Sequence, residues 1–358
     1  MRRIAAKYAR PGMVIGRRVY DSAGNLMFDQ NDILGKDCSM LMTIHGVKEV
    51  LVEDFRVADV PVQPLIAPEL EAEAAQTLHQ LLTESAGSAT IDDTLLEQVE
   101  KPIYAMTRDL FRDVVGEINA AGCFSPDDFV NFRPVKVAGA SLLMGRKAGL
   151  RMIELASLGL AALLMDVGYV CAPGLQVKPG PLTEQEKELV RTHPDVGARL
   201  LERYQRFSAE VGKTVRHHHE RLDGSGYPAG LRGDAISTPA RILAITDSYY
   251  ELVSERPGQH ALLPHQAIEF IMAYSGELFD PGLVQLFSRT VPLYPAGTTV
   301  KLSTGEVGII SNGNPGHIGR PVVRICSDSA HIPLTNPFDI DLSRAEFQDR
   351  LIVEAMEY

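Results

Sequence analysis

The stretch HHHERLDGSGYP, residues 217–228, places three histidines, an acid and a glycine-rich turn within twelve residues. Neutral imidazole is the commonest metal ligand that proteins use. The glycines and the proline are typical of a loop that turns tightly and approaches another group closely. This stretch therefore predicts a site around the histidines, and other parts of the chain must supply the groups that complete it.

The composition is that of a folded acidic protein with two or three domains. The 358 residues are 45% hydrophobic and carry a formal net charge of −11. This charge argues against DNA, RNA and anionic membranes as partners, because binding to them needs a basic surface, but a small phosphorylated ligand remains compatible with it. No apolar run follows the N-terminal Met-Arg-Arg, so we expect no signal peptide and a cytoplasmic protein. Reduced thiols are expected for the cysteines, which form no CxxC pair: Cys38, Cys123, Cys171 and Cys326.

The pattern of residues divides the chain into four segments and predicts a mainly α fold. Residues 1–62 read as a small N-terminal α/β module, and residues 63–91 as a proline-rich linker followed by an acidic helix. Residues 92–290 are helical throughout. Residues 291–358 form a small β-rich segment, with a hairpin at TVKLSTGEVGIIS (299–311) and a terminal helix at DLSRAEFQDRLIVEAME (341–357).

Two candidate metal ligands precede the histidine triplet. Asp166 ends the apolar run LGLAALLMD. The longest apolar stretch, Met152 to Val170, carries Glu154 and Asp166 and therefore reads as a buried helix rather than a membrane span. The alternative is an acid at a helix end that faces water. His193 follows a capping box of Thr183 and Glu186 and lies on the apolar stripe of its helix. Its alternative is a hydrogen-bonded packing residue of the core.

The triplet and a later acid extend this set. At about 100° per residue, His218 and His219 straddle the apolar stripe of their helix, whereas His217 lies on the far side and is expected to face solvent. Asp247 interrupts an almost wholly apolar helix, where it needs a cation or a hydrogen-bonding partner. Together these residues predict a nitrogen and oxygen metal site for iron or manganese, with zinc and nickel as alternatives.

The motifs resemble the HD-GYP family of bacterial cyclic-di-GMP phosphodiesterases. HHHERLDGSGYP carries the resemblance with ARILAITDSYYELVSERP and GELFDPGLV after it and LLMDVGY and RTHPDVGARLL before it, over residues 125–290. The resemblance implies an all-helical HD domain with a two- or three-metal centre. In such a centre the metals stabilise the attacking and leaving oxygens of phosphodiester hydrolysis. It also implies that Arg256 and Tyr227 contact the substrate.

The chain departs from the family pattern at one metal position. The His-Asp pair of the family reads Met165-Asp166, Tyr169 replaces a phosphate-facing Lys, and Arg133 stands where an early His is expected. The neighbouring position retains its histidines. We therefore expect one metal ion rather than two. If Arg133 points inward, it replaces the lost cation and pairs with Asp166 or Asp247.

Three functions follow as hypotheses. The first is a degenerate HD-GYP protein that binds metal and a cyclic dinucleotide with weak or no hydrolysis, because one ion cannot clamp both oxygens of the displacement. The second is an active phosphodiesterase or phosphohydrolase with a reduced metal site. The third is a scaffold that docks signalling proteins through its GYP loop. The expected ligand is cyclic-di-GMP or a related dinucleotide, and the resemblance makes a homodimer plausible.

Overall fold

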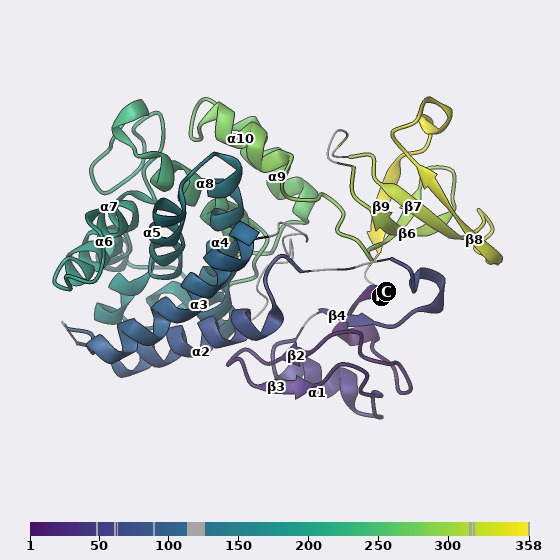
Figure 1. The fold of residues 1–358 in the computed structure, drawn as a ribbon, viewed down its shortest axis with the longest axis horizontal. Coiled ribbons are helices and arrows are strands. Elements are labelled where there is room, and N and C mark those ends of the chain that lie inside the picture. The colour runs from purple at the N-terminus through teal and green to yellow at the C-terminus, as the bar shows by residue number, and fades with distance from the viewer. Residues whose placement is uncertain are drawn as a thin grey trace. The chain divides into compact units, whose positions relative to one another are not determined.

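The computed structural model describes residues 1–47, 49–60, 62, 64–88, 90–112, 126–314, 317 and 319–356. The chain divides into two compact units. The helical unit is Leu65–Ser288, and the terminal unit combines Met1–Pro64 with Arg289–Tyr358. Figure 1 shows the helices α2 to α10 in the first of these and the strands in the second. The fold is thus mainly α with small β-containing segments at both ends of the chain, as the sequence predicts.

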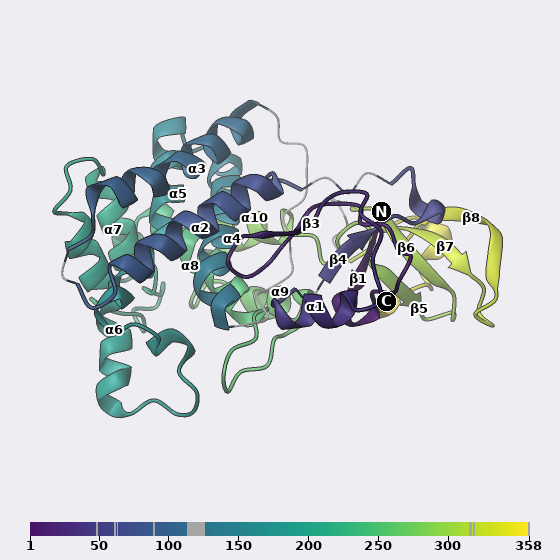
Figure 2. The ribbon, with the colours of Figure 1, turned by 90° about the horizontal axis from the view of Figure 1, so that it is seen from below.

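The helical unit is a bundle around a central apolar helix. Its helices are α2 (Pro68–Glu84), α3 (Asp93–Arg112), α4 (Pro126–Lys147), α5 (Met152–Leu163), α6 (Glu184–Leu201), α7 (Ala209–His217), α8 (Thr238–Leu252), α9 (Pro264–Ala273) and α10 (Pro281–Ser288). Helix α5 packs against α3, α4 and α7, and α2 packs along α3 and α4 (Figure 2).

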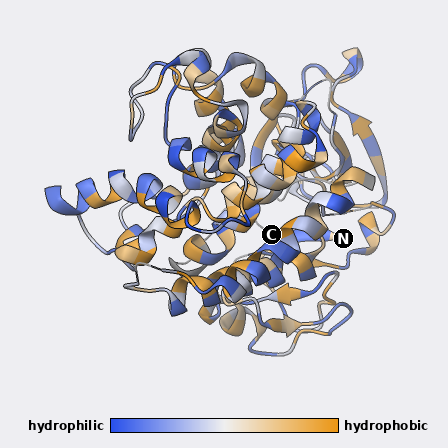
Figure 3. Ribbon diagram, turned by 60° about the vertical axis from the view of Figure 1, so that its left-hand side comes forward, coloured by the Kyte–Doolittle hydropathy of each residue, from blue (hydrophilic) through white to orange (hydrophobic). Residues whose placement is uncertain are grey.

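The apolar run of the sequence forms the core of this bundle. Met152–Cys171 is long and apolar enough to cross a membrane by length and composition, but most of it is buried inside the protein, as expected of a core helix. The outer helices alternate between hydrophilic and hydrophobic residues (Figure 3), which gives each of them one buried face. Helix α6 begins at the predicted capping box, in which Thr183 accepts from the Glu186 N–H and the Glu186 carboxylate accepts from the Thr183 N–H.

The described residues of the terminal unit form three antiparallel sheets. Strand β1 (Arg2–Ala5) pairs with β4 (Glu49–Val52), and β2 (Val19–Tyr20) pairs with β3 (Leu26–Phe28). Helix α1 (Cys38–Ile44) precedes β4. The third sheet has the order β8-β7-β6-β5-β9. Its strands are β5 (Thr299–Leu302), β6 (Val307–Asn312), β7 (Val322–Ser327), β8 (Pro333–Asp341) and β9 (Ile352–Met356).

One hairpin of this sheet follows directly from the local sequence. Strands β5 and β6 pair antiparallel at the predicted TVKLSTGEVGIIS hairpin. Gly305 in its turn has φ = 97°, a left-handed conformation that glycine adopts without a Cβ penalty. The turn chemistry therefore explains why this hairpin was predictable.

The predicted terminal helix is wrong. Residues 352–356 form strand β9, which pairs with β5 in the register Val300↔Ala355, and only Ala345–Phe347 form a short 3-10 helix. Pairing with a strand about fifty residues earlier outweighs the helical preference of Glu, Ala and Met in this segment.

The boundaries of the units also differ from the four predicted segments. The two chain ends share one apolar cluster, which includes Val57 and Val60 from the first segment and Ile309 from the last. Arg324 of β7 pairs with Asp59, so polar contacts join the ends as well. Helix α2, which was predicted within a linker, belongs to the helical unit because it packs on α3 and α4.

Candidate metal centre

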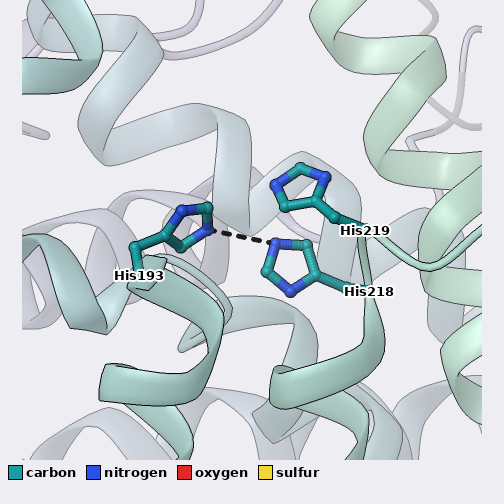
Figure 4. Close-up of side chains that lie close together, drawn as sticks. All are labelled: His193, His218 and His219. Carbon is teal, nitrogen blue, oxygen red and sulfur yellow. Dashed lines mark hydrogen bonds between the residues drawn. The ribbon is translucent and has the colours of Figure 1, made fainter. Parts of the chain in front are cut away.

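Three histidines converge in the helical unit. His193 lies in α6, and His218 and His219 follow the end of α7. One ligand atom from each of them lies within 4.8 Å of the other two. The Nε2 atoms of His193 and His218 are 3.4 Å apart, and Figure 4 shows the rings directed toward one another. The inward orientation that the helical stripe predicted for His218 and His219 thus brings them together with His193.

Backbone contacts determine which ring nitrogen of two histidines is free to bind an ion. Nδ1 of His193 lies 2.6 Å from the Val190 carbonyl oxygen, and Nδ1 of His218 lies 2.6 Å from that of Val215. A carbonyl oxygen only accepts, so both Nδ1 atoms carry hydrogen, an assignment made from the hydrogen-bond network. In the neutral rings the Nε2 lone pairs therefore face each other, an arrangement that a shared cation would stabilise.

Asp166 adds a carboxylate to this group. It lies in the turn between α5 and the 3-10 helix η3 (Val167–Cys171), and its Oδ1 is 3.3 Å from Nε2 of His193. The backbone at Gly168 lies so close to α6 that a Cβ there would overlap the carbonyl oxygen of His193. Glycine at this position therefore allows the turn to bring Asp166 against the histidines.

Arg133 links the two inward acids. It lies in α4 with 3% of its surface exposed, and its Nη2 and Nη1 donate to Asp166 Oδ2 and Asp247 Oδ1, respectively. Its guanidinium also lies over the ring of Phe129, 4.5 Å from the centroid. Arg133 thus points inward, the condition set in the sequence analysis, and it pairs with both acids rather than with one of them. Asp247, on α8, is thereby held in an ion pair and is separate from the group of three histidines.

The shared arginine affects the two carboxyls differently. Burial raises the pKa of Asp166, but the charge of the paired Arg133 outweighs it, and the pKa falls below its usual range. Burial raises the pKa of Asp247 to about 7, because the opposing Arg133 charge is partly offset by Glu251 and Asp166. One guanidinium cannot fully compensate two buried carboxylates, so the first proton taken up goes to Asp247.

Burial favours the neutral form of the histidines in the 217–219 segment. Burial, together with His193 and against the opposing charge of Asp166, lowers the pKa of His218 to about 3. Burial and the two neighbouring histidines also lower the pKa of His219. His217, which was predicted to face solvent, is half-buried, and this burial lowers its pKa as well. Neutral imidazoles at working pH are the form that binds metal.

Two tyrosines flank the histidines. Tyr169, in η3, stacks on His193 with ring centroids 4.3 Å apart and an interplanar angle of 21°. Tyr227 lies against His219 with centroids 4.7 Å apart. Burial raises the pKa of both phenols, and the acidic groups nearby raise it further. Both hydroxyls therefore stay protonated, and Tyr169 offers no positive charge where the family pattern has a Lys.

The remaining predicted residues lie at different depths. Met165 is fully buried next to Asp166. Arg256 is half-buried, donates to Gln259 Oε1 at 2.8 Å and pairs with Glu251 at 3.3 Å. Its guanidinium lies 5.5 Å from the centroid of the Phe129 ring that Arg133 also covers. Arg256 is thus connected to the arginine–carboxylate side of the centre through one shared ring.

The sequence analysis did not identify the structural roles of two residues in this region. Glu220 is buried and accepts hydrogen bonds from backbone N–H groups of the loop that follows it. Gly168 permits the close approach of η3 to α6. An acid that continues an inward-facing histidine pair was a usable signal for Glu220, whereas no periodicity marks a glycine at a helix crossing. Among the cysteines, Cys38, Cys171 and Cys326 are free, and Cys123 lies outside the described residues.

The donor set fits a divalent transition metal. Two Nε2 atoms with a defined tautomer, a third imidazole and one carboxylate oxygen are borderline ligands of the kind that iron, manganese, zinc and nickel accept. The carbonyl partners of His193 and His218 supply the outer contacts that orient metal-binding imidazoles. A second ion between Asp166 and Asp247 does not fit the residues present, because the Arg133 guanidinium already occupies that position.

Comparison with known proteins places this centre in a family. The HD domain family matches residues 108–283. "Cyclic di-GMP phosphodiesterase PA4108" of Pseudomonas aeruginosa is 33% identical over 254 residues, which cover 67% of this chain and 61% of that protein. "Cyclic di-GMP phosphodiesterase response regulator RpfG" of Xanthomonas campestris is 40% identical over 149 residues, which cover 41% and 39%. The chain therefore spans less than two thirds of the length of these relatives.

A third relative and one solved structure extend the comparison. "3'3'-cGAMP-specific phosphodiesterase 2" of Vibrio cholerae is 39% identical over 128 residues, which cover 35% of this chain and 24% of that protein. The solved structure of "Bd1817, a HDG"Y"P protein from Bdellovibrio bacteriovorus" aligns with a TM-score of 0.52 at 14% identity, over 80% of this chain and 97% of that one. At this identity the structural likeness concerns the fold alone.

Proposed function

Because this chain belongs to the HD-GYP family of HD domains, we propose that it is a single-metal receptor for a cyclic dinucleotide with weak or no phosphodiesterase activity. The relatives named as phosphodiesterases of cyclic-di-GMP and cGAMP support the ligand class. The observation that carries the proposal is the Arg133 guanidinium paired with both Asp166 and Asp247. It places a permanent organic cation where a second metal would need those carboxylates.

His193, His218, His219 and one oxygen of Asp166 would hold the ion, with iron or manganese as the first expectation. The ion would supply Lewis-acid polarisation of a phosphate oxygen. Asp166 divides its oxygens between His193 and Arg133, so it both faces the ion site and orients the arginine. Arg133 neutralises charge but presents no exchangeable coordination position, so it does not activate a nucleophile.

Two further side chains would contact the ligand. The Tyr227 hydroxyl stays protonated and is able to donate a hydrogen bond to a phosphate oxygen. Arg256 is half-buried and would offer a guanidinium to the same charge, in competition with its present partner Glu251. A cytoplasmic location, a homodimer and docking of signalling proteins through the GYP loop remain predictions of the sequence.

The deciding experiment combines a metal count, ligand binding and turnover. Protein purified without chelators is expected to contain about one ion per chain by elemental analysis. We expect it to bind cyclic-di-GMP in calorimetry but to hydrolyse it barely at all with excess manganese or iron under anaerobic, reducing conditions. Met165→His is the matched variant. A rise to two ions there would indicate a latent second site, which the Arg133 position argues against.

Two outcomes would replace the proposal. Robust hydrolysis by the wild-type protein would establish the alternative, an active phosphodiesterase with a reduced metal site, which the intact histidine group and the names of the relatives favour. A protein that binds neither metal nor cyclic dinucleotide would instead be a scaffold for protein interactions. Each outcome is read on the unmodified chain, so variant misfolding does not affect the decision.

A further inference from the structure

The loop after the histidines folds back onto them. The Tyr227 N–H donates to the His219 carbonyl at 3.2 Å, and Gly226 lies so close to the chain that a Cβ there would overlap the backbone of Glu220 and Arg221. Gly224 in the same loop has φ = 82°. Residues 219–231 are therefore one closely packed turn, and the histidine segment and the Gly-Tyr-Pro segment cannot move independently.

Glu220 holds this turn closed from inside. Its side chain is 1% exposed, and its two oxygens each accept one backbone hydrogen bond, Oε1 from Ala229 at 2.7 Å and Oε2 from Leu231 at 2.9 Å. A buried carboxylate is costly unless both oxygens are satisfied, and buried N–H groups need acceptors. Only a carboxylate offers two acceptor oxygens here, because an amide would turn its NH₂ toward one of the two donors.

His219 depends on this turn for its orientation. His193 and His218 each donate Nδ1–H to a carbonyl of their own helix. No comparable ring hydrogen bond of His219 is found within the described part of the chain. Its ring instead contacts the His218 ring at 4.0 Å and the Tyr227 ring at 4.7 Å between centroids. Tyr227, which precedes the Ala229 N–H bonded to Glu220 by two residues, therefore forms one wall of the position of His219.

We infer that Glu220 is a positioning residue, which holds Tyr227 against His219 and thereby sets the third imidazole of the metal centre. The inference rests on the proposed metal site and adds a residue that touches neither the ion nor the ligand. The loop then acts as a part of the centre, because loss of the carboxylate at 220 releases Ala229 and Leu231 and with them the tyrosine ring. The effect should resemble loss of a residue that supports a metal ligand.

Cobalt titration of the full chain tests this inference, with the affinity and the visible absorption bands of bound Co²⁺ as readouts. Glu220→Gln, Glu220→Ala and Tyr227→Ala are each expected to weaken Co²⁺ about 10- to 100-fold and to change the bands. The double variant Glu220→Ala with Tyr227→Ala should lose little more than the larger single loss, because both act on His219. Asp223→Asn is the matched control, since Asp223 is exposed in the same loop and accepts its hydrogen bonds from the N–H and the hydroxyl of Ser225, not from the segment that Glu220 holds.

The outcomes separate the inference from the function on which it rests. If the wild-type chain binds no Co²⁺, the metal site fails and the inference fails with it. If the wild type binds Co²⁺ and Glu220→Gln matches it in affinity and spectrum, the inference alone is overturned, even if thermal unfolding shows that the variant is less stable. Full additivity of the two single losses would also overturn it.

Discussion

The two halves of the centre satisfy buried polar groups in opposite ways. On one side, the imidazoles of His193, His218 and His219 converge, and burial lowers the pKa of His218 and His219. On the other side, the carboxyl groups of Asp166 and Asp247 share a guanidinium supplied by Arg133. The chain thus fills one cation position with its own side chain, and the other is the position at which we propose an exogenous ion.

The halves meet at Asp166. One of its oxygens faces His193 and the other accepts from Arg133, so a change on either side reaches the opposite side through a single carboxylate. Each half therefore makes a distinct prediction about stability, pH and metal affinity. The following changes separate them, from the largest expected effect to the smallest.

Removal of the built-in cation should have the largest effect. Arg133→Met leaves two buried carboxylates without a counter-charge, and breaking a buried ion pair costs about 3–5 kcal/mol. The loss of unfolding free energy should appear in urea titration at pH 7.5 and shrink at pH 5.5, where the carboxyls take up protons. Arg133→Lys keeps the positive charge but not the forked guanidinium, so its unfolding free energy should lie between those of the wild type and Arg133→Met. If Arg133→Met were as stable as the wild type at both pH values, Arg133 would not be the counter-charge that stabilises the two carboxyls.

A change at the close contact between η3 and α6 should come next. Gly168→Ala places a methyl group against the carbonyl oxygen of His193, so the turn or the helix must shift. Such overpacking should cost about 3 kcal/mol of unfolding free energy, and it should weaken metal binding as well because Asp166 and His193 move apart. Gly35→Ala serves as the control, because a Cβ at Gly35 meets open space. Gly149→Ala would not match it, because Gly149 has a positive φ, which strains alanine. Equal metal affinity in Gly168→Ala and wild type would show that this contact is not needed by the site.

The histidine half predicts acid lability of the metal-free protein. The folded pKa of His218 is about 3, below its ordinary value of 6.5, so its contribution to stability is complete above pH 6.5 and is lost as the pH falls toward 3. From pH 7 to pH 5 this amounts to about 2 kcal/mol.

The titration of Asp247 changes stability with pH in the opposite direction, so the experiment must separate the contributions of His218 and Asp247. Its folded pKa of about 7 lies above its ordinary value, so its contribution is present at low pH and is lost as the pH rises through 7. His218→Gln isolates the histidine term. The stability difference between wild type and this variant should decrease by about 2 kcal/mol from pH 7 to pH 5 in chelator, and a constant difference would contradict the assigned neutral form.

The smallest effect is expected for the hydroxyl of Tyr169. Its ring stacks on His193, whereas its phenol stays protonated. Tyr169→Phe should therefore change metal affinity by less than tenfold, about 1 kcal/mol, and Tyr169→Ala should change it more. Isothermal titration with Mn²⁺ measures both. An equal loss of Mn²⁺ affinity in the two variants would mean that the hydroxyl of Tyr169, and not its ring, supports metal binding by the histidines.

The sequence predicted the histidine half better than the arginine half. The inward orientation of His218 and His219 follows from the apolar stripe of one helix, and the position of His193 follows from a capping box and the stripe of another. The double ion pair of Arg133 joins α4, the turn after α5 and α8, which are far apart along the chain. Side-chain periodicity predicts which face of each helix is buried, but it does not predict which other elements pack against that face.

The same limit explains the misassigned C-terminal strand. Glu354, Ala355 and Met356 favour helix, and pairing with β5 draws them into a strand. The role of Glu220 also depends on a contact with a loop about ten residues later, which local pattern does not report.

By itself, the sequence determined the helical class of the core, the family-specific loop and the residues that face inward, because these follow from local propensity, side-chain periodicity and a long motif. Tertiary structure decided that Arg133 bridges both acids, that the two chain ends form one unit and that Glu220 closes the loop on Tyr227. The physical reason is that burial and ion pairing depend on which distant elements pack together, and the free energy of those contacts outweighs the local preferences.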